Sequence, residues 1–321
     1  MNLGIVGSGG IVNTCLDAVQ KIVDLHCVAI CVRKQSINKG EKLQTAFNID
    51  KIYTEYTDLI HDGNIDVIYI GLPNHLHFQY VKEALLANKN VVCEKPFTSN
   101  AQQLEELIQL AQREKCFLFE AITTKYSPSM SVVKQYLPKI GAIKLVHSNY
   151  SQYSSRYHAY LDGKVAPVFD PKMSGGALMD INIYNIHLNL LLLGMPMQVY
   201  YIENKGFNGV DTSGVLVMQY PQWVSVCMGA KDCDGLNQTL IQGEKGQILI
   251  HGPANDIDSV ELILPEEKQH LVADKCENRM VEEWLFFIDC IVKKNTAACD
   301  AALQHSMRVM CVLDMARQEK G

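Results

Sequence analysis

The first 121 residues alternate short apolar runs with longer segments in which apolar residues recur at helical spacing. Five runs predict buried strands, at residues 3–7, 26–32, 67–72, 90–94 and 116–121. Between them, segments such as "HLHFQYVKEALLAN" and "AQQLEELIQLAQREK" show the periodicity of amphipathic helices. Short apolar strands joined by helices indicate a parallel sheet covered on both faces. Residues 1–121 are therefore predicted to form a doubly wound α/β domain.

The pattern changes after residue 121, where candidate strands alternate apolar and polar positions in part. These strands are expected at residues 143–151, 198–204, 214–220, 223–230, 237–242 and 247–251. Helical patterns are expected at residues 175–193, 280–294 and 300–318. A run of strands with helices to one side predicts an α+β domain over residues 122–321, built on a large, mostly antiparallel open sheet.

Composition and charge narrow the classes of partner. The net charge is −6, and no segment is rich in Lys and Arg, so nucleic acid is not expected as a partner. No apolar stretch approaches membrane-spanning length, since "LNLLLLGMP" ends its run at Gly194. The chain starts directly with strand-like sequence in place of a signal peptide. We therefore expect no membrane partner and a cytoplasmic location.

A glycine-rich turn, "GIVGSGGIV" at residues 4–12, follows the first predicted strand and opens the first predicted helix. Gly7 and Gly9 have the spacing that lets a backbone approach a dinucleotide pyrophosphate, and Gly10 and Ile11 follow at the helix N-terminus. Val12 departs from the fingerprint, which has Gly or Ala there. The alternative is an ordinary glycine-rich turn, but the strand-turn-helix context favours cofactor binding.

The residues after the second strand bear on the choice of cofactor. NAD enzymes commonly place an acidic residue here, whereas this chain has Arg33 and Lys34. A guanidinium can pair with a 2′-phosphate and stack on adenine. The sequence therefore favours NADP, with NAD as the alternative; an exposed basic pair without a ligand is the simpler interpretation that remains.

The motif "GLPNHLH" ends the predicted strand at residues 67–72. Because ligands bind at the carboxyl ends of parallel strands, several of its residues are expected to line the nicotinamide side. These are Leu72, Pro73, Asn74 and His77. The pair His75 and His77 lacks a nearby third ligand, so no metal is expected.

Another strand end, "NVVCEKPF", brings Glu94 and Lys95 to the same edge of the predicted sheet. A lysine placed there is suited to proton transfer and to contact with the cofactor. Pro96 restricts the turn that carries it, which argues against a freely moving surface lysine.

A second group of polar residues lies in "SGGALMDINIYNIHLNLLLLG". Asp180, Tyr184 and His187 have the spacing of one helix face, and the rest of the segment is strongly apolar. The structural interpretation is a solvated face or polar groups satisfied in an interface. The functional interpretation is a substrate-binding face that works with Lys95.

These segments together resemble the glucose–fructose oxidoreductase/inositol dehydrogenase/rhizopine-catabolism (Gfo/Idh/MocA) family of NAD(P)-dependent oxidoreductases. The resemblance covers nearly the whole chain and rests on the glycine loop, "PNHLH", "EKPFT" and "GGALMDINIY". It implies an N-terminal Rossmann domain, with Lys95, Asp180 and Tyr184 as catalytic residues. Tyr184 is similar to the glucose–fructose oxidoreductase and dimeric dihydrodiol dehydrogenase branch, and His187 stands where inositol dehydrogenases have an acid.

The resemblance implies hydride transfer between nicotinamide C4 and a carbinol or carbonyl carbon of a sugar, polyol or cyclic diol. Tyr184 would be the general acid/base, Lys95 would activate it and hold the substrate oxygen, and Asp180 would orient Lys95 or the substrate. The roles of Tyr184 and Lys95 could be exchanged. An NAD-dependent glycosidase and a non-catalytic cofactor or sugar sensor are the alternatives.

Members of this family commonly pair through the open face of the second sheet. The resemblance therefore implies that residues 122–321 serve both substrate binding and assembly into a homodimer or a higher homo-oligomer.

Overall fold

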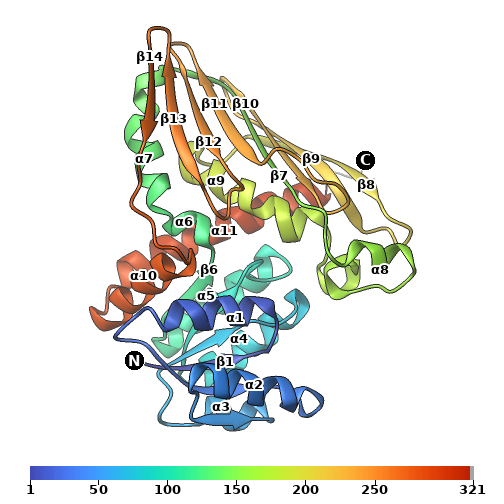
Figure 1. Ribbon diagram of the computed structural model, residues 1–321, viewed down its shortest axis with the longest axis vertical. Coiled ribbons are helices and arrows are strands. Elements are labelled where there is room, and N and C mark those ends of the chain that lie inside the picture. The colour runs from blue at the N-terminus through green and yellow to red at the C-terminus, as the bar shows by residue number, and fades with distance from the viewer. Residues whose placement is uncertain (319–321) are drawn as a thin grey trace. The chain divides into compact units, whose positions relative to one another are not determined.

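The structure is a computed structural model that describes residues 1–318, and the chain divides into two compact units (Figure 1). The first unit contains Met1–Ala121 and Cys276–Met307. The second contains Ile122–Lys275 and, of the described residues, 308–318. Each unit is described by itself below.

The first unit is built on a six-stranded parallel sheet with the strand order β3-β2-β1-β4-β5-β6. The strands are β1 (Asn2–Val6), β2 (His26–Cys31), β3 (Lys51–Tyr53), β4 (Val67–Ile70), β5 (Asn90–Glu94) and β6 (Leu118–Ala121). Nearly all side chains of β1 and β4 are buried, as expected for central strands covered on both faces. This order is that of dinucleotide-binding folds, and the predicted doubly wound sheet is confirmed.

Helices connect these strands. They are α1 (Gly10–Val19), η1 (Lys34–Ser36), α2 (Ile37–Phe47), α3 (Tyr56–Ile60), η2 (Asn74–Leu76), α4 (His77–Leu86) and α5 (Ala101–Glu114). Helix α5 begins where its sequence indicates, because the Asn100 side chain accepts a hydrogen bond from the Gln103 amide at 2.9 Å.

A late segment of the chain completes this unit. Helices α10 (Met280–Val292) and the start of α11 (Thr296–Gln318) belong to it. The rings of Trp284 and Phe287 lie 5.9 Å and 4.7 Å from those of Tyr69 and Phe119, respectively. The sequence prediction had placed the whole of residues 122–321 in the second domain. The structure differs because the apolar face of α10 is buried with residues of the first sheet.

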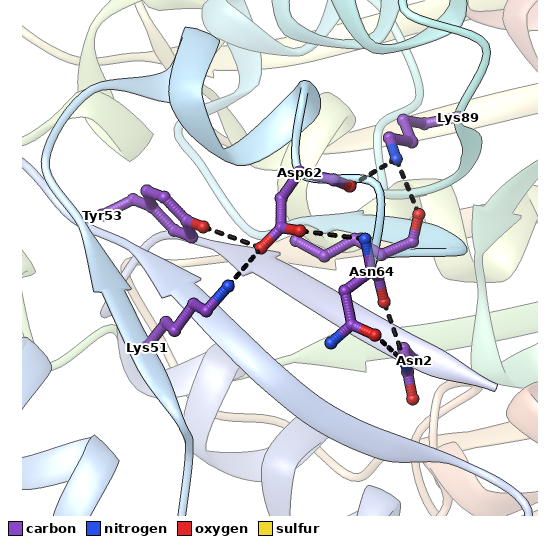
Figure 2. A network of polar contacts seen from close by, with 7 residues as sticks. Asn2, Lys51, Tyr53, Asp62, Asn64 and Lys89 are labelled. Atoms are coloured by element: carbon purple, nitrogen blue, oxygen red, sulfur yellow. Dashed lines mark hydrogen bonds and ion pairs between the residues drawn. The ribbon is translucent and has the colours of Figure 1, made fainter.

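A polar network fixes strand β3, which the sequence prediction missed because it has only three residues (Figure 2). The Asp62 carboxylate accepts hydrogen bonds from the Tyr53 hydroxyl at 2.7 Å and the Asn64 amide at 2.9 Å. It also pairs with the Lys51 ammonium at 3.0 Å. The Asn64 amide, followed by Tyr53 and Lys51, lowers the pKa of Asp62 to about 2.

The same network reaches the starts of neighbouring strands (Figure 2). The Asn2 side-chain amide donates to the Asn64 carbonyl at 2.8 Å, and the Lys89 ammonium donates to the Asp62 carbonyl at 2.7 Å. Asn2 begins β1, and Lys89 directly precedes β5. The network therefore lies at the amino ends of the parallel strands.

The second unit is built on an eight-stranded sheet with the order β14-β13-β12-β11-β7-β10-β9-β8. Its strands are β7 (Ile143–Ser151), β8 (Gln198–Lys205), β9 (Asp211–Gln219), β10 (Val224–Ala230), β11 (Gln238–Gly243), β12 (Gln247–His251), β13 (Ser259–Leu264) and β14 (Glu267–Leu271). Only the β7–β10 pair is parallel among these neighbours, which confirms the predicted, mostly antiparallel sheet.

The helical segments of this unit are mostly short. They are α6 (Thr123–Tyr126), α7 (Pro128–Tyr136), η3 (Leu137–Ile140), α8 (Tyr157–Leu161), η4 (Pro167–Phe169), η5 (Pro171–Met173), the π-turn η6 (Leu178–Asn182), α9 (Ile183–Leu193) and the end of α11. Among residues 1–318, no helix combines the length and the apolar composition needed to cross a membrane.

Buried asparagines attach α9 to the sheet. Asn182, Asn185 and Asn189 share one helix face and have no exposed surface. The Asn182 side chain donates to the Cys227 carbonyl of β10 at 3.0 Å, and the Asn189 side chain donates to Ser148 of β7 at 2.9 Å. These bonds satisfy polar groups inside an apolar layer and fix the rotation of the helix.

Candidate functional site

The first group of candidate residues begins with the glycine loop between β1 and α1. Gly7 has a φ of +118°, and a Cβ there would collide with the Gly71 carbonyl oxygen. Val12, the departure from the fingerprint, is fully buried, and its Cγ2 lies 2.8 Å from the position of a Cβ on Gly71. Because Gly71 has no side chain, Val12 fits where the fingerprint has a smaller residue.

Gly9 and Gly10 differ from Gly7. Gly9 has an ordinary φ of −81°, and no atom lies within 4 Å of a Cβ built on either residue. The fold itself therefore does not require glycine at these two positions. Ile11 follows in the first turn of α1, which contains no acidic residue. Open space beside the N-terminal amides of a helix fits a pyrophosphate, and we take this as agreement between the residues and a dinucleotide.

The basic pair follows β2. Arg33 is exposed, and among residues 1–318 it forms no ion pair. Lys34 is engaged with the Glu55 carboxylate, with 2.7 Å between Nζ and Oε1. Arg33 is therefore the member of the pair that remains available for a 2′-phosphate.

The loop after β4 carries the "PNHLH" residues. Pro73 is exposed, and Leu72 and Asn74 are half-buried, so all three have surface for a ligand. His77 is fully buried, with Nδ1 2.8 Å from the Pro96 carbonyl oxygen and Nε2 2.8 Å from that of Leu72. Its ring thus links the loops after β4 and β5. No cluster of three or more potential metal ligands occurs among residues 1–318.

The loop after β5 is held by buried carboxylates. Glu94 accepts hydrogen bonds from the Tyr69 hydroxyl at 2.6 Å and from the Lys95 amide at 3.2 Å. Burial raises the pKa of Glu94. Glu120 accepts from the Phe97 amide at 3.2 Å. The Lys95–Pro96 peptide bond is cis, and the Lys95 side chain is half-buried.

The second group of candidate residues lies at the start of α9, in the second unit. Asp180 belongs to the π-turn, a feature often found at functional sites, and its side chain is 25% exposed. Tyr184 is 8% exposed, and its ring centre lies 5.8 Å from that of Tyr150. His187 is fully buried, so direct contact with a substrate requires movement or a deeply inserted ligand group.

Two charged residues that the sequence analysis missed surround this turn. Lys231 is 2% exposed and forms an ion pair with Asp180. Asp211, in β9, accepts hydrogen bonds from the Leu178 amide at 2.6 Å and the Tyr201 hydroxyl at 2.7 Å. Burial raises the pKa of Asp211. Neither residue belongs to a local motif, and no signal in the sequence identifies its partner.

The structure therefore groups the predicted site residues by unit. Those predicted to bind the cofactor lie at or after the carboxyl ends of β1, β2, β4 and β5 of the first sheet. Asp180, Tyr184 and His187 lie together on the π-turn and α9 of the second unit. The individual roles of these residues stay predictions.

Comparisons with known proteins agree with this organisation. Residues 1–122 match a family model described as "Oxidoreductase family, NAD-binding Rossmann fold", and residues 138–249 match the "GFO/IDH/MocA C-terminal domain". An uncharacterized oxidoreductase of Escherichia coli is 32% identical over 78% of this chain and 76% of its own length. The NADP(+)-dependent scyllo-inositol 2-dehydrogenase of Bacillus subtilis is 28% identical over 100% of this chain and 97% of its own.

A solved structure has the same fold. It is a 3-ketoreductase from Actinomadura kijaniata in complex with NADP and TDP-benzene, with a TM-score of 0.87 and 19% identity. The match covers 99% of this chain and 97% of that one. Together with the family matches, the comparisons confirm the predicted oxidoreductase activity and a nicotinamide dinucleotide as cofactor.

Proposed function

The chain belongs to the Gfo/Idh/MocA family of oxidoreductases, and from that premise we propose that it transfers a hydride between NADP and a hydroxyl-bearing carbon of a sugar, polyol or cyclic diol. The observation that carries this proposal is the pairing of two features within one chain. Gly9 and Gly10 leave space at a helix N-terminus, and Asp180 of the π-turn lies four residues before Tyr184 of α9.

NADP is favoured over NAD by Arg33. Its exposed guanidinium can form charge-assisted hydrogen bonds to a 2′-phosphate, each contributing about 1.5–3 kcal/mol. We expect Arg33→Ala to weaken NADPH binding by roughly 10- to 100-fold and to leave NADH binding unchanged. Fluorescence titration with both cofactors measures this, and Arg33→Lys serves as the charge-conserving control. Equal losses for NADPH and NADH would contradict the assignment.

The catalytic residues are proposed to be Tyr184, Lys95 and Asp180. Bound NADP supplies or accepts the hydride at nicotinamide C4. Tyr184 exchanges a proton with the substrate oxygen, Lys95 donates a hydrogen bond to that oxygen, and Asp180 accepts from a substrate hydroxyl. The half-buried Lys95 and the partly exposed Asp180 support these roles.

A screen of scyllo-inositol, D-xylose and a trans-dihydrodiol with NADP⁺, followed by NADPH absorbance, tests the activity. With any substrate found, we expect Tyr184→Phe to lower kcat by ~10²- to 10⁴-fold. NADPH affinity should be unchanged. Tyr136→Phe is the matched control, because Tyr136 is a half-buried residue at the end of helix α7, outside the candidate site and outside the strands of the proposed dimer face. Full turnover by Lys95→Met would refute the mechanism, and glycoside cleavage without net NADPH formation would favour the glycosidase alternative.

We further propose a homodimer that forms through the open face of the eight-stranded sheet. Apolar residues that are only half-buried support this, among them the cross-strand neighbours Val217 and Val226, and Val215 and Met228. Light scattering should give about twice the chain mass, and Val217→Lys should reduce the measured mass.

The 11 cysteines, all free thiols, support a reducing compartment such as the cytoplasm.

A further inference from the structure

The second unit contains a buried lysine whose charge is balanced by a residue of the candidate site. Lys231 directly follows β10, and its side chain is 2% exposed. Its ammonium pairs with Asp180 Oδ2 and lies 4.9 Å from the centre of the Phe169 ring. A buried ammonium is strongly unfavourable without compensation, and a carboxylate and an aromatic face both provide it.

The two members of this pair differ in exposure. Asp180 is 25% exposed, whereas Lys231 is almost completely covered. Asp180 therefore has surface through which it can meet a ligand, and Lys231 does not. This asymmetry indicates that Lys231 acts through Asp180 and does not contact a substrate directly.

The surroundings of the pair are fixed on both sides. The Lys231 amide donates to the Thr212 carbonyl at 2.8 Å, and the Lys231 carbonyl accepts from the Ser154 amide at 2.9 Å. On the other side, Asp211 holds the Leu178 amide at the start of the π-turn at 2.6 Å. The ammonium and the turn that carries Asp180 are thus both attached to the sheet.

We propose that Lys231 is a positioning residue that fixes the Asp180 carboxylate for a hydroxyl group of an uncharged polyol. An ionised carboxylate has about four acceptor positions, so it can hold the ammonium and still accept from a substrate hydroxyl. The pair adds no net charge, which suits an uncharged ligand. This inference rests on the proposed function, because it takes Asp180 as a substrate residue.

The first experiment needs no substrate. Thermal unfolding is compared for Lys231→Met, Asp180→Asn and the double variant. We expect Lys231→Met to lower the melting temperature, because it removes the ammonium that pairs with the Asp180 carboxylate, and the double variant to recover part of that loss. Lys144→Met is the control, because its pair with Glu244 is 53% exposed on both sides. Additive effects of the two substitutions would overturn the proposal.

The second experiment uses NADP⁺ and the polyol that the screen identifies as a substrate. Since misplacement of a residue that positions the substrate can cost ~10²-fold, we expect Lys231→Met to lower kcat by about that factor. KM should change by less than about threefold, and NADPH affinity should stay the same. Lys231→Arg should recover most of kcat, since a guanidinium also binds a carboxylate. An unchanged kcat in a destabilised Lys231→Met variant would make the pair structural and overturn the positioning role.

The two experiments separate this inference from the proposed function. A wild-type protein that turns over no polyol, together with a non-additive melting cycle, overturns the proposed function and supports the Lys231–Asp180 pair alone. An active wild-type protein with an additive cycle overturns the positioning role and leaves the proposed function in place.

Discussion

Two glycines of the same loop should respond in opposite ways to substitution by alanine. Gly7 has a φ of +118°, and its missing side chain avoids the Gly71 carbonyl. Gly9 has a φ of −81°, and a Cβ there meets no atom within 4 Å. The fold therefore requires glycine at position 7. We attribute the presence of glycine at position 9 to the close approach of the cofactor.

The structure sets the expected magnitudes. Gly7→Ala combines a backbone cost of roughly 1–2 kcal/mol with a collision against a main-chain oxygen, so we expect a loss of at least about 2 kcal/mol in the free energy of unfolding. Gly9→Ala adopts its backbone without strain and should be neutral, or stabilising by about 0.4–1 kcal/mol. Its methyl group should displace the pyrophosphate and cost one charge-assisted hydrogen bond, about 1.5–3 kcal/mol, which is roughly 10- to 100-fold in NADPH affinity.

Urea denaturation and NADPH fluorescence titration measure the two effects separately. Gly63→Ala is the matched control, because its Cβ would also meet no atom within 4 Å, but Gly63 lies between α3 and β4, near the amino ends of the strands. It should leave NADPH binding unchanged. Wild-type NADPH affinity in Gly9→Ala, or equal destabilisation by Gly7→Ala and Gly9→Ala, would refute the reasoning.

Two further predictions concern the loops of the first unit. Asp62→Asn should lower the free energy of unfolding by about 1 kcal/mol at pH 7, a value reduced for partial solvent screening. Because the pKa of Asp62 is lowered from 3.8 to about 2, this difference should be complete above about pH 4 and disappear as the pH falls toward 2, which urea denaturation across pH would show. His77→Leu should lower the free energy of unfolding by about 1–3 kcal/mol, because it removes the buried ring that contacts the carbonyls of Leu72 and Pro96, whereas substitution of the exposed His75 by Leu should have little effect.

Local patterns were sufficient to predict most of the fold. Apolar runs and helical spacing located five of the six strands of the first sheet, because buried parallel strands have strongly apolar sequences. β3 is too short for a pattern, and it is held by contacts with Asp62. β13 and β14 were missed in a region rich in charged residues, where neighbouring strands determine the structure. Helix α10 packs with the first unit because its apolar face is buried against residues of that sheet. The order of the elements along the chain does not predict this contact.

The candidate site residues likewise include some that local sequence motifs identify and some that only the tertiary structure identifies. Gly9 and Lys95 stand in motifs whose chemistry depends on adjacent residues, so the sequence was enough to single them out. Lys231 lies 51 positions from Asp180, and the two meet only because β10 and the π-turn are both fixed on the sheet. A buried charge has to be balanced wherever the fold leaves it, so its partner is set by tertiary packing. For this reason, the sequence does not identify a residue such as Lys231, which is proposed to orient a site residue without contacting the ligand.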